Sequence, residues 1–301
     1  MRRSEEQGGR ELVYTVLTPA RDEEDNLRRL ARCLAQQSVR PTRWLIVING
    51  GRDGSLAVAR SLAATHGWVD VAVAEGTKYP TRGGHIARIV NDHIGSLAAT
   101  SDVVVKVDAD VSIPSDYFAH LLEAFQRNPR LGLASGVRYE RENGSWRQRH
   151  VTNGAVAGPC RAYRVACLED VLPLEEEFGW DGIDECKARL RGWTTMTVRD
   201  AAFHHHRLTG QRDGSRFKAW VRQGQASHFM AYRPLYLTAR VIYHLTRERA
   251  AMGMLLGYLQ SALTRAPQCH DDAVRAMVRS RQTLPKLPAR IREKRGQTSR
   301  R

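Results

Sequence analysis

The chain has 301 residues, of which 47 are Lys or Arg and 32 are Asp or Glu, so its formal net charge at pH 7 is +15. With 42% hydrophobic residues and 11 prolines, its composition is that of a globular protein and excludes a disordered chain. The longest apolar runs fall short of the roughly 18 to 20 residues that a membrane-spanning helix needs, so we expect no such helix. The basic charge favours an anionic partner, such as a nucleic acid, a lipid surface or a phosphorylated small molecule.

The start of the chain and the cysteines predict a cellular compartment. The first residues are charged and polar and lack the apolar segment of a secretory signal. The five cysteines form no Cys-x-x-Cys pair and no zinc-type spacing. We therefore expect a cytoplasmic protein with reduced, mostly structural cysteines.

Short apolar runs alternate with helical patterns in the first part of the chain. The β-branched runs 12–17, 44–48, 69–74 and 103–107 predict strands, and apolar residues at helical spacing lie between them. This alternation favours a mostly parallel, Rossmann-like α/β sheet flanked by helices. From about residue 216 the alternation stops and helical patterns continue.

The sequence suggests four segments. We predict a flexible leader over 1–11, an α/β domain over 12–215, a helical C-terminal region over 216–275 and a basic, disordered tail over 276–301. The α/β domain lacks the glycine signatures of a dinucleotide-binding domain, a P-loop and a nucleophile elbow.

Two carboxylates follow the predicted buried strand over 103–107. Asp108 and Asp110 are two residues apart, so they can point to the same side of an extended chain. Two hard oxygen ligands suit Mg²⁺ or Mn²⁺, with phosphate oxygens and water completing the shell. The alternative is a turn in which one Asp caps the next helix.

Five segments resemble, in order and spacing, the motifs of the family 2 glycosyltransferases, which have the GT-A fold. Residues 18–24 resemble the opening Pro-Ala-x-Asn-Glu segment, and residues 44–55 resemble the segment that ends in Asp-Asn-Gly-Ser-Thr-Asp-Gly-Thr. Residues 108–110 match the Asp-x-Asp motif. Residues 179–193 resemble the acidic acceptor-side motif, and residues 205–207 resemble a late metal or phosphate contact. The resemblance covers roughly residues 12 to 245.

The resemblance implies a metal-dependent inverting glycosyltransferase. Its substrates would be a nucleotide-sugar donor and a hydroxyl of a glycan, a lipid-linked molecule or a small-molecule acceptor, and its cofactor would be Mn²⁺ or Mg²⁺. It implies metal ligation by Asp108, Asp110 and His205 or His206. It implies contacts to the nucleotide and its diphosphate from Pro19, Ala20, Arg21, Glu23, Asn49, Asp53, Asp108, Arg207 and Arg222. Apart from the resemblance, the histidine run is more typical of an exposed polar turn than of a metal site, and the basic stretch around Arg222 is as typical of a solvated face as of a diphosphate contact.

The resemblance also implies a general base among the acidic residues that open a predicted helix. An acceptor hydroxyl becomes a good nucleophile when a positioned carboxylate takes its proton. We favour Asp184, with Asp181 and Glu185 as rivals. Each of these acids could instead complement the helix N-terminus.

Two departures from the family leave the identity of the donor nucleotide undetermined. The family usually has an Asp where this chain has Ile48, and Gly-Ser-Thr where it has Gly50-Gly51-Arg52.

A sugar nucleotidyltransferase is the enzymatic alternative, although the acidic residues after the first predicted strand differ from its glycine-rich basic loop. A nucleic-acid-binding protein is the alternative from another class, although no nucleic-acid motif is present.

The helical C-terminal region predicts peripheral contact with the inner face of an anionic membrane. The alternative is that its apolar residues pack the helices onto the α/β domain. The apolar residues and the arginines near them are Leu235, Leu237, Val241, Ile242 and Leu245, and Arg233, Arg240, Arg247 and Arg249.

Overall fold

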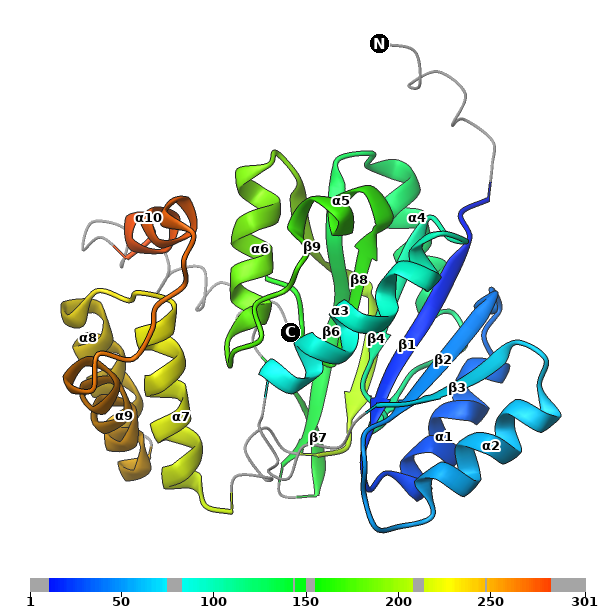
Figure 1. Ribbon diagram of the computed structural model, residues 1–301, viewed down its shortest axis with the longest axis horizontal. Helices are drawn as coiled ribbons and strands as arrows, with labels where there is room; N and C mark the ends of the chain where they lie inside the picture. Colours follow the sequence, from blue (N-terminus) through cyan, green and yellow to red (C-terminus); the bar gives the residue numbers. More distant parts are fainter. Residues whose placement is uncertain are drawn as a thin grey trace.

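The structure is a computed structural model that describes residues 11–74, 83–142, 144–149, 155–207, 214–246 and 248–282. Within these ranges, nine strands form one sheet in the order β3-β2-β1-β4-β8-β6-β9-β5, with β7 paired to β6 (Figure 1). The strands are β1 (Tyr14–Ala20), β2 (Arg43–Ile48), β3 (Val69–Val73), β4 (Val103–Val107), β5 (Val111–Ser112), β6 (Leu131–Glu142), β7 (Ser145–Gln148), β8 (Cys160–Arg164) and β9 (Thr194–His205).

The first four strands in this order run parallel to one another, as the predicted strand–helix alternation requires. β8 runs antiparallel to β4, while β9 pairs in parallel with β6 and antiparallel with β5. β5 and β9 therefore join residues that are far apart in the sequence. The predicted α/β fold is confirmed.

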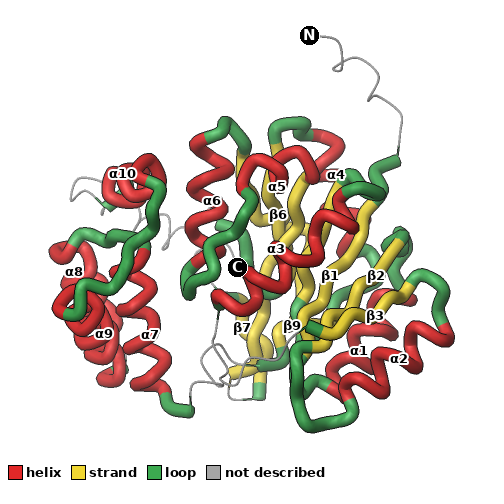
Figure 2. Tube along the Cα trace, in the orientation of Figure 1, coloured by secondary structure: helices red, strands yellow, loops and turns green. Residues whose placement is uncertain are grey.

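Helices cover both faces of the sheet (Figures 1 and 2). One face packs against α1 (Glu24–Ala35), α2 (Ser55–Thr65) and α4 (Tyr117–Arg127). The other packs against α3 (Gly84–Ala98), α5 (Val165–Val171) and α6 (Trp180–Leu190). In β4, Val103 and Val105 belong to the first core and Val104 to the second, so this continuous apolar run is buried on both faces.

The C-terminal region forms a separate group of helices beside α6 (Figure 2). It contains α7 (Arg216–Phe229), α8 (Pro234–Leu245), a 3₁₀ turn (Arg249–Ala251), α9 (Met252–Leu263) and α10 (Asp272–Ser280). Phe229, Val274 and Val278 pack against Ile183 and Cys186 of α6 and join this group to the α/β domain. In the ranges that the structure covers, no helix combines the length and apolar character needed to cross a bilayer.

The structure describes only parts of the four segments that the sequence predicts. α7 begins at Arg216, where the strand–helix alternation was predicted to stop. α10 extends to Ser280, so the first residues of the predicted disordered tail are helical. Most of the leader and the tail beyond residue 282 are outside the described residues. All five cysteines are unpaired.

Candidate active site

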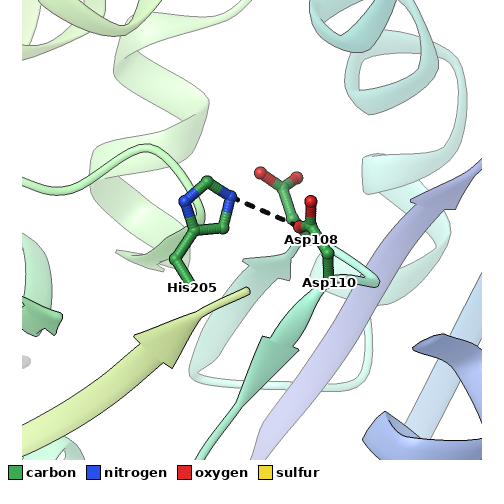
Figure 3. A group of neighbouring side chains, drawn as sticks. All are labelled: Asp108, Asp110 and His205. Carbon is green, nitrogen blue, oxygen red and sulfur yellow. Dashed lines mark ion pairs between the residues drawn. The ribbon is translucent and has the colours of Figure 1, made fainter. Parts of the chain in front are cut away.

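Asp108, Asp110 and His205 come together at the carboxyl edge of the sheet (Figure 3). Each offers one ligand atom, and these atoms lie within 4.8 Å of one another. The two aspartates occupy the turn between β4 and β5, and β5 pairs with the end of β9, where Val111 stands opposite His205. This long-range pairing brings the histidine to the carboxylates.

Buried and half-buried cations hold the two carboxylates in place. Lys106 is 3% exposed, forms an ion pair with Asp108 and donates a hydrogen bond of 3.0 Å to the carbonyl of Gly158. Asp110 lies 3.4 Å from His205 Nε2 and 3.2 Å from Arg207 Nη1. Burial opposes ionisation of Asp110, but the hydrogen bond and charge of His205, with Arg207, hold the pKa of Asp110 below its usual value.

Glu140 of β6 stands behind His205. Its Oε1 lies 3.4 Å from His205 Nδ1, and its Oε2 accepts a hydrogen bond of 2.8 Å from Arg149. Burial alone would lower the pKa of His205, but Asp110 and Glu140 raise it to about 9. The histidine is thus held between two carboxylates, with Nε2 directed at Asp110.

These residues fit a hard divalent cation. Two carboxylates and one imidazole are ligands that Mn²⁺ and Mg²⁺ accept. A carboxylate bonded to the second nitrogen of the imidazole, as in the Glu140 contact, is the usual support of a metal-ligating histidine.

His206 lies outside this group of three, so its metal ligation stays a prediction. Its Nε2 lies 2.8 Å from Ser112 Oγ, and its ring packs edge-on against Trp146. Successive side chains of an extended strand point to opposite sides, so only one of the two neighbouring histidines reaches the aspartates. Burial, the largest cause, and nearby Arg29 lower the pKa of His206 to about 4, so it is neutral at physiological pH.

Arg207 connects the predicted nucleotide loop after β1 to the group formed by Asp108, Asp110 and His205. The Nη1 and Nη2 atoms of Arg207 donate hydrogen bonds of 2.8 and 3.0 Å to the buried Glu23 carboxylate. Nη1 also contacts Asp110. Pro19 and Ala20 are the last residues of β1, and half-buried Arg21 follows them. The Pro19-to-Glu23 segment therefore lies at the same edge of the sheet as the aspartates.

The turn after β2 contributes Asn49 and Asp53, which have different environments. Asn49 is 4% exposed, and its Oδ1 has no hydrogen-bond partner among the described residues. A buried polar atom of this kind fits a donor group on a ligand. Asp53 instead accepts hydrogen bonds from the amides of Ser55 and Glu24, at 2.9 and 3.0 Å, and so ties the turn to the start of α1.

Asp184, the residue favoured from the sequence as the general base, is buried in an ion pair, and its catalytic role stays a prediction. It is 1% exposed, and its two oxygens accept hydrogen bonds from Arg161 and from the Tyr163 hydroxyl. Arg161 is itself fully buried. These contacts favour a structural role for Asp184, because both of its oxygens are already bonded and the carboxylate is buried.

Asp181 is the acid of α6 whose carboxylate lies next to Gly158. It is half-buried in the first turn of the helix, and its Oδ2 lies 3.2 Å from the position that a Cβ would take at Gly158. Gly158 and Pro159 contact the other side of the site, because their carbonyls accept hydrogen bonds from Lys106 Nζ and from the Asp108 amide. Asp181 thus lies one short segment of backbone away from Asp108.

Glu185 also forms contacts that hold α6 in place. It accepts a hydrogen bond of 2.9 Å from the Val156 amide and lies 3.4 Å from Arg161 and 3.5 Å from Arg189. Burial, its largest influence, raises the pKa of Glu185 to about 7. These contacts direct its carboxylate toward the 156–161 segment.

Arg222 lies in the middle of α7. The side chains that form ion pairs with Asp108, Asp110 and His205 include Lys106, Glu140 and Arg207. The predicted contact of Arg222 with a diphosphate stays a prediction.

Three residues of the site were not assigned a role from the sequence: Lys106, Glu140 and Arg161. Lys106 carried a signal, because a lysine inside an apolar strand must find an anionic partner. Glu140 and Arg161 carried none, because their partners His205 and Asp184 are separated from them by 65 and 23 positions.

This fold and this site define a glycosyltransferase of the GT-A type. Residues 15–164 match the family described as Glycosyl transferase family 2. This part of the chain belongs to that family, and the protein is a glycosyltransferase. No curated protein matches the chain by sequence.

Solved structures of glycosyltransferases share the fold. The mannosyltransferase PcManGT from Pyrobaculum calidifontis, in complex with GDP-Man and Mn²⁺, has a TM-score of 0.56 and 17% identity over 94% of this chain and 84% of its own. GalNAc-T7 with UDP, GalNAc and Mn²⁺ has a TM-score of 0.57 and 13% identity over 89% of this chain and 61% of its own. S. aureus TarS 1-349 with UDP-GlcNAc has a TM-score of 0.53 and 14% identity over 79% of this chain and 74% of its own. The chain spans only 44% of a longer TarS chain.

Proposed function

We propose that the protein transfers a sugar from a nucleotide-sugar donor to an acceptor hydroxyl in one inverting displacement. The observation that carries this proposal is the Asp108–Asp110–His205 group at the carboxyl edge of the sheet. The half-buried carboxylate of Asp181 lies next to Gly158, whose carbonyl accepts a hydrogen bond from Lys106, the ion-pair partner of Asp108. Ligands of open α/β sheets bind at this edge. The donor is a nucleotide sugar, and the acceptor is a hydroxyl of a glycan, a lipid-linked molecule or a small molecule, as predicted from the sequence.

Asp108, Asp110 and His205 would hold Mn²⁺ or Mg²⁺ in this proposal. When bound, the ion would offset the negative charge that grows on the departing diphosphate. His205 must lose its proton to coordinate a cation, so the ion would compete with the proton that Asp110 and Glu140 favour. The Mn²⁺ in the PcManGT and GalNAc-T7 structures supports this assignment.

The donor nucleotide would occupy the loops after β1 and β2. Asn49 offers its unpaired buried Oδ1 to a donor group of the base or ribose. Arg207 faces Asp110 and could turn from Glu23 toward the diphosphate. The nucleotides in the three similar structures, GDP-Man, UDP and UDP-GlcNAc, support a nucleotide-sugar donor without selecting the base.

Asp181 would act as the general base. It is accessible, and it lies across the Gly158 segment from the aspartates, where an acceptor hydroxyl could approach a bound donor. It would take the hydroxyl proton while the acceptor oxygen attacks the sugar from the side opposite the leaving diphosphate. One base and one cation suffice for such an inverting step.

The experiment is to incubate the purified full chain with UDP, GDP and dTDP sugars in the presence of Mn²⁺ and to measure nucleoside diphosphate by chromatography. Water can act as a slow acceptor, so we expect release from one class of donor, loss with EDTA and loss in Asp110→Asn. The absence of release from every donor, or equal release in Asp110→Asn, would contradict the metal-dependent displacement.

A further inference from the structure

The positive charge of the protein is concentrated after residue 215. Residues 1–215 contain 29 Lys and Arg against 28 Asp and Glu, a net charge of +1. Residues 216–301 contain 18 basic against 4 acidic residues, a net charge of +14. The α/β domain is therefore almost neutral, and nearly all of the charge that attracts an anionic partner belongs to the C-terminal region.

The same region exposes large apolar side chains. On α8, Leu235 and Ile242 are 63% and 60% exposed. We call the exposed surface of α8 and α9 the apolar face; it consists of Leu235, Ile242, Met252, Leu256, Leu259 and Leu263. α9 contains no charged residue from Met252 to Leu263, which is unusual for a helix with an exposed side.

The packing of α8 and α9 does not use this face. Leu237 and Val241 of α8 form a small core with Met254 and Tyr258 of α9. Of the apolar residues predicted to meet a membrane, Leu237, Val241 and Leu245 thus pack among the C-terminal helices and not onto the α/β domain, while Leu235 and Ile242 stay exposed. The helices lie at the side of the molecule away from the parallel strands (Figure 1).

Arginines lie at the ends of the apolar face. Exposed Arg249 and Arg265 flank α9, and exposed Arg233 precedes Leu235. Beside Leu235 opens a cavity of about 350 Å³ lined by Tyr232, Arg233, Pro234, Tyr258 and Arg279.

The two arginines of this cavity are held by backbone groups. Arg233 Nε donates to the carbonyl of Arg279, and Arg279 Nε donates to the carbonyl of Ala231, both at 3.2 Å. Within the described part of the chain, neither guanidinium has a carboxylate partner. The cavity thus combines positive charge with aromatic walls, which suits an anionic headgroup at the end of an apolar chain.

We infer that the apolar face and its arginines dock the protein on an anionic phospholipid bilayer. The leucines would enter the boundary between headgroups and acyl chains, while the arginines remain at the phosphates. The charge of the whole C-terminal region is complementary to this partner, which favours a bilayer over a second copy of an equally basic region. The inference does not depend on the proposed reaction.

The test is flotation of the full chain with vesicles of phosphatidylcholine, with and without phosphatidylglycerol, at low and high salt. We expect binding only to the anionic vesicles, weakened by salt because screening shortens the reach of charge. Leu256→Gln with Leu263→Gln should reduce the partition coefficient about tenfold or more. Arg249→Gln with Arg265→Gln should reduce it about fivefold for each arginine.

Matched variants of the α/β domain are the controls. Val73→Gln removes a side chain that is 61% exposed, and Arg60→Gln removes an exposed arginine, so both should float like the wild type. Equal flotation on neutral and anionic vesicles, none on either, or normal flotation of the Leu256 and Leu263 variant would overturn the inference. A dimer in sedimentation experiments that the leucine variant dissociates, without vesicle binding, would assign the face to a second copy instead.

Discussion

Three acids of α6 lie within one helical turn of each other, and a single buried arginine separates their roles. Arg161 binds the Asp184 carboxylate, lies 3.4 Å from Glu185 Oε1 and donates a hydrogen bond of 2.7 Å to the backbone carbonyl of Asp181. Arg161 therefore fixes the first turn of the helix without using the Asp181 carboxylate. In the proposed mechanism, Asp184 and Glu185 position the helix and Asp181 acts as the base.

We predict opposite effects for two matched substitutions in this turn. Asp181→Asn should lower transfer by about 10²- to 10⁴-fold, with little change in the free energy of unfolding or in donor binding, because a general base acts only on the acceptor. Asp184→Asn should lower the free energy of unfolding by about 3 kcal/mol, because it leaves Arg161 buried without its anionic partner. Urea denaturation and nucleotide release measure the two effects. Asp184→Asn with normal stability and no activity would instead support Asp184, the residue favoured from the sequence, as the base.

Glu185 should give the protein a pH-dependent stability. Its pKa is near 4.5 in the unfolded chain and about 7 in the folded protein, so the folded state retains a proton that the unfolded state loses. Stability from this carboxyl is therefore highest at low pH and falls as the pH rises from about 4.5 to 7. Since each pKa unit is worth about 1.4 kcal/mol, the wild type should lose about 2 to 3 kcal/mol relative to Glu185→Gln across this window. Parallel urea stability curves for the two proteins between pH 4.5 and 7.5 would contradict this assignment.

At the scale of elements, α7 and α9 approach each other so closely that glycines are required. A Cβ at Gly257 would lie 1.9 Å from the Val221 carbonyl oxygen, and one at Gly224 would lie 2.0 Å from the Met254 carbonyl oxygen. Because these neighbours are backbone atoms, a side chain cannot be accommodated by a rotamer change. The glycines let the two helices pack backbone to backbone.

We predict that Gly257→Ala lowers the free energy of unfolding by about 2 kcal/mol or more, as expected for overpacking against a rigid backbone. Gly95→Ala, also inside a helix, is the matched control because its Cβ would meet nothing within 4 Å. It should stabilise the protein by up to about 1 kcal/mol through helix propensity. Thermal or urea unfolding compares them, and equal effects of the two substitutions would mean that the helices do not pack this closely.

At the scale of the whole molecule, the sequence predicted what local patterns determine. The run 103–107 predicted a buried strand, and Asp108 and Asp110 predicted the cation site at its end, because strand periodicity and residue chemistry are local. The position of His205 next to the aspartates depends on the pairing of β9 with β5, and the proposal of Asp181 in place of Asp184 as the base depends on Arg161. Both are set by contacts between distant parts of the chain, which periodicity does not specify.

The most direct measurement of the central claim is a thermal-shift panel of UDP, GDP, dTDP and CMP sugars, with and without Mn²⁺, on the wild type and Asp110→Asn. A ligand that binds only the folded protein raises its unfolding temperature by mass action. We predict that one class of donor stabilises the wild type only when Mn²⁺ is present and does not stabilise Asp110→Asn. Stabilisation by no donor, or the same Mn²⁺-dependent shift in Asp110→Asn, would contradict a metal-bound nucleotide-sugar site at Asp108, Asp110 and His205.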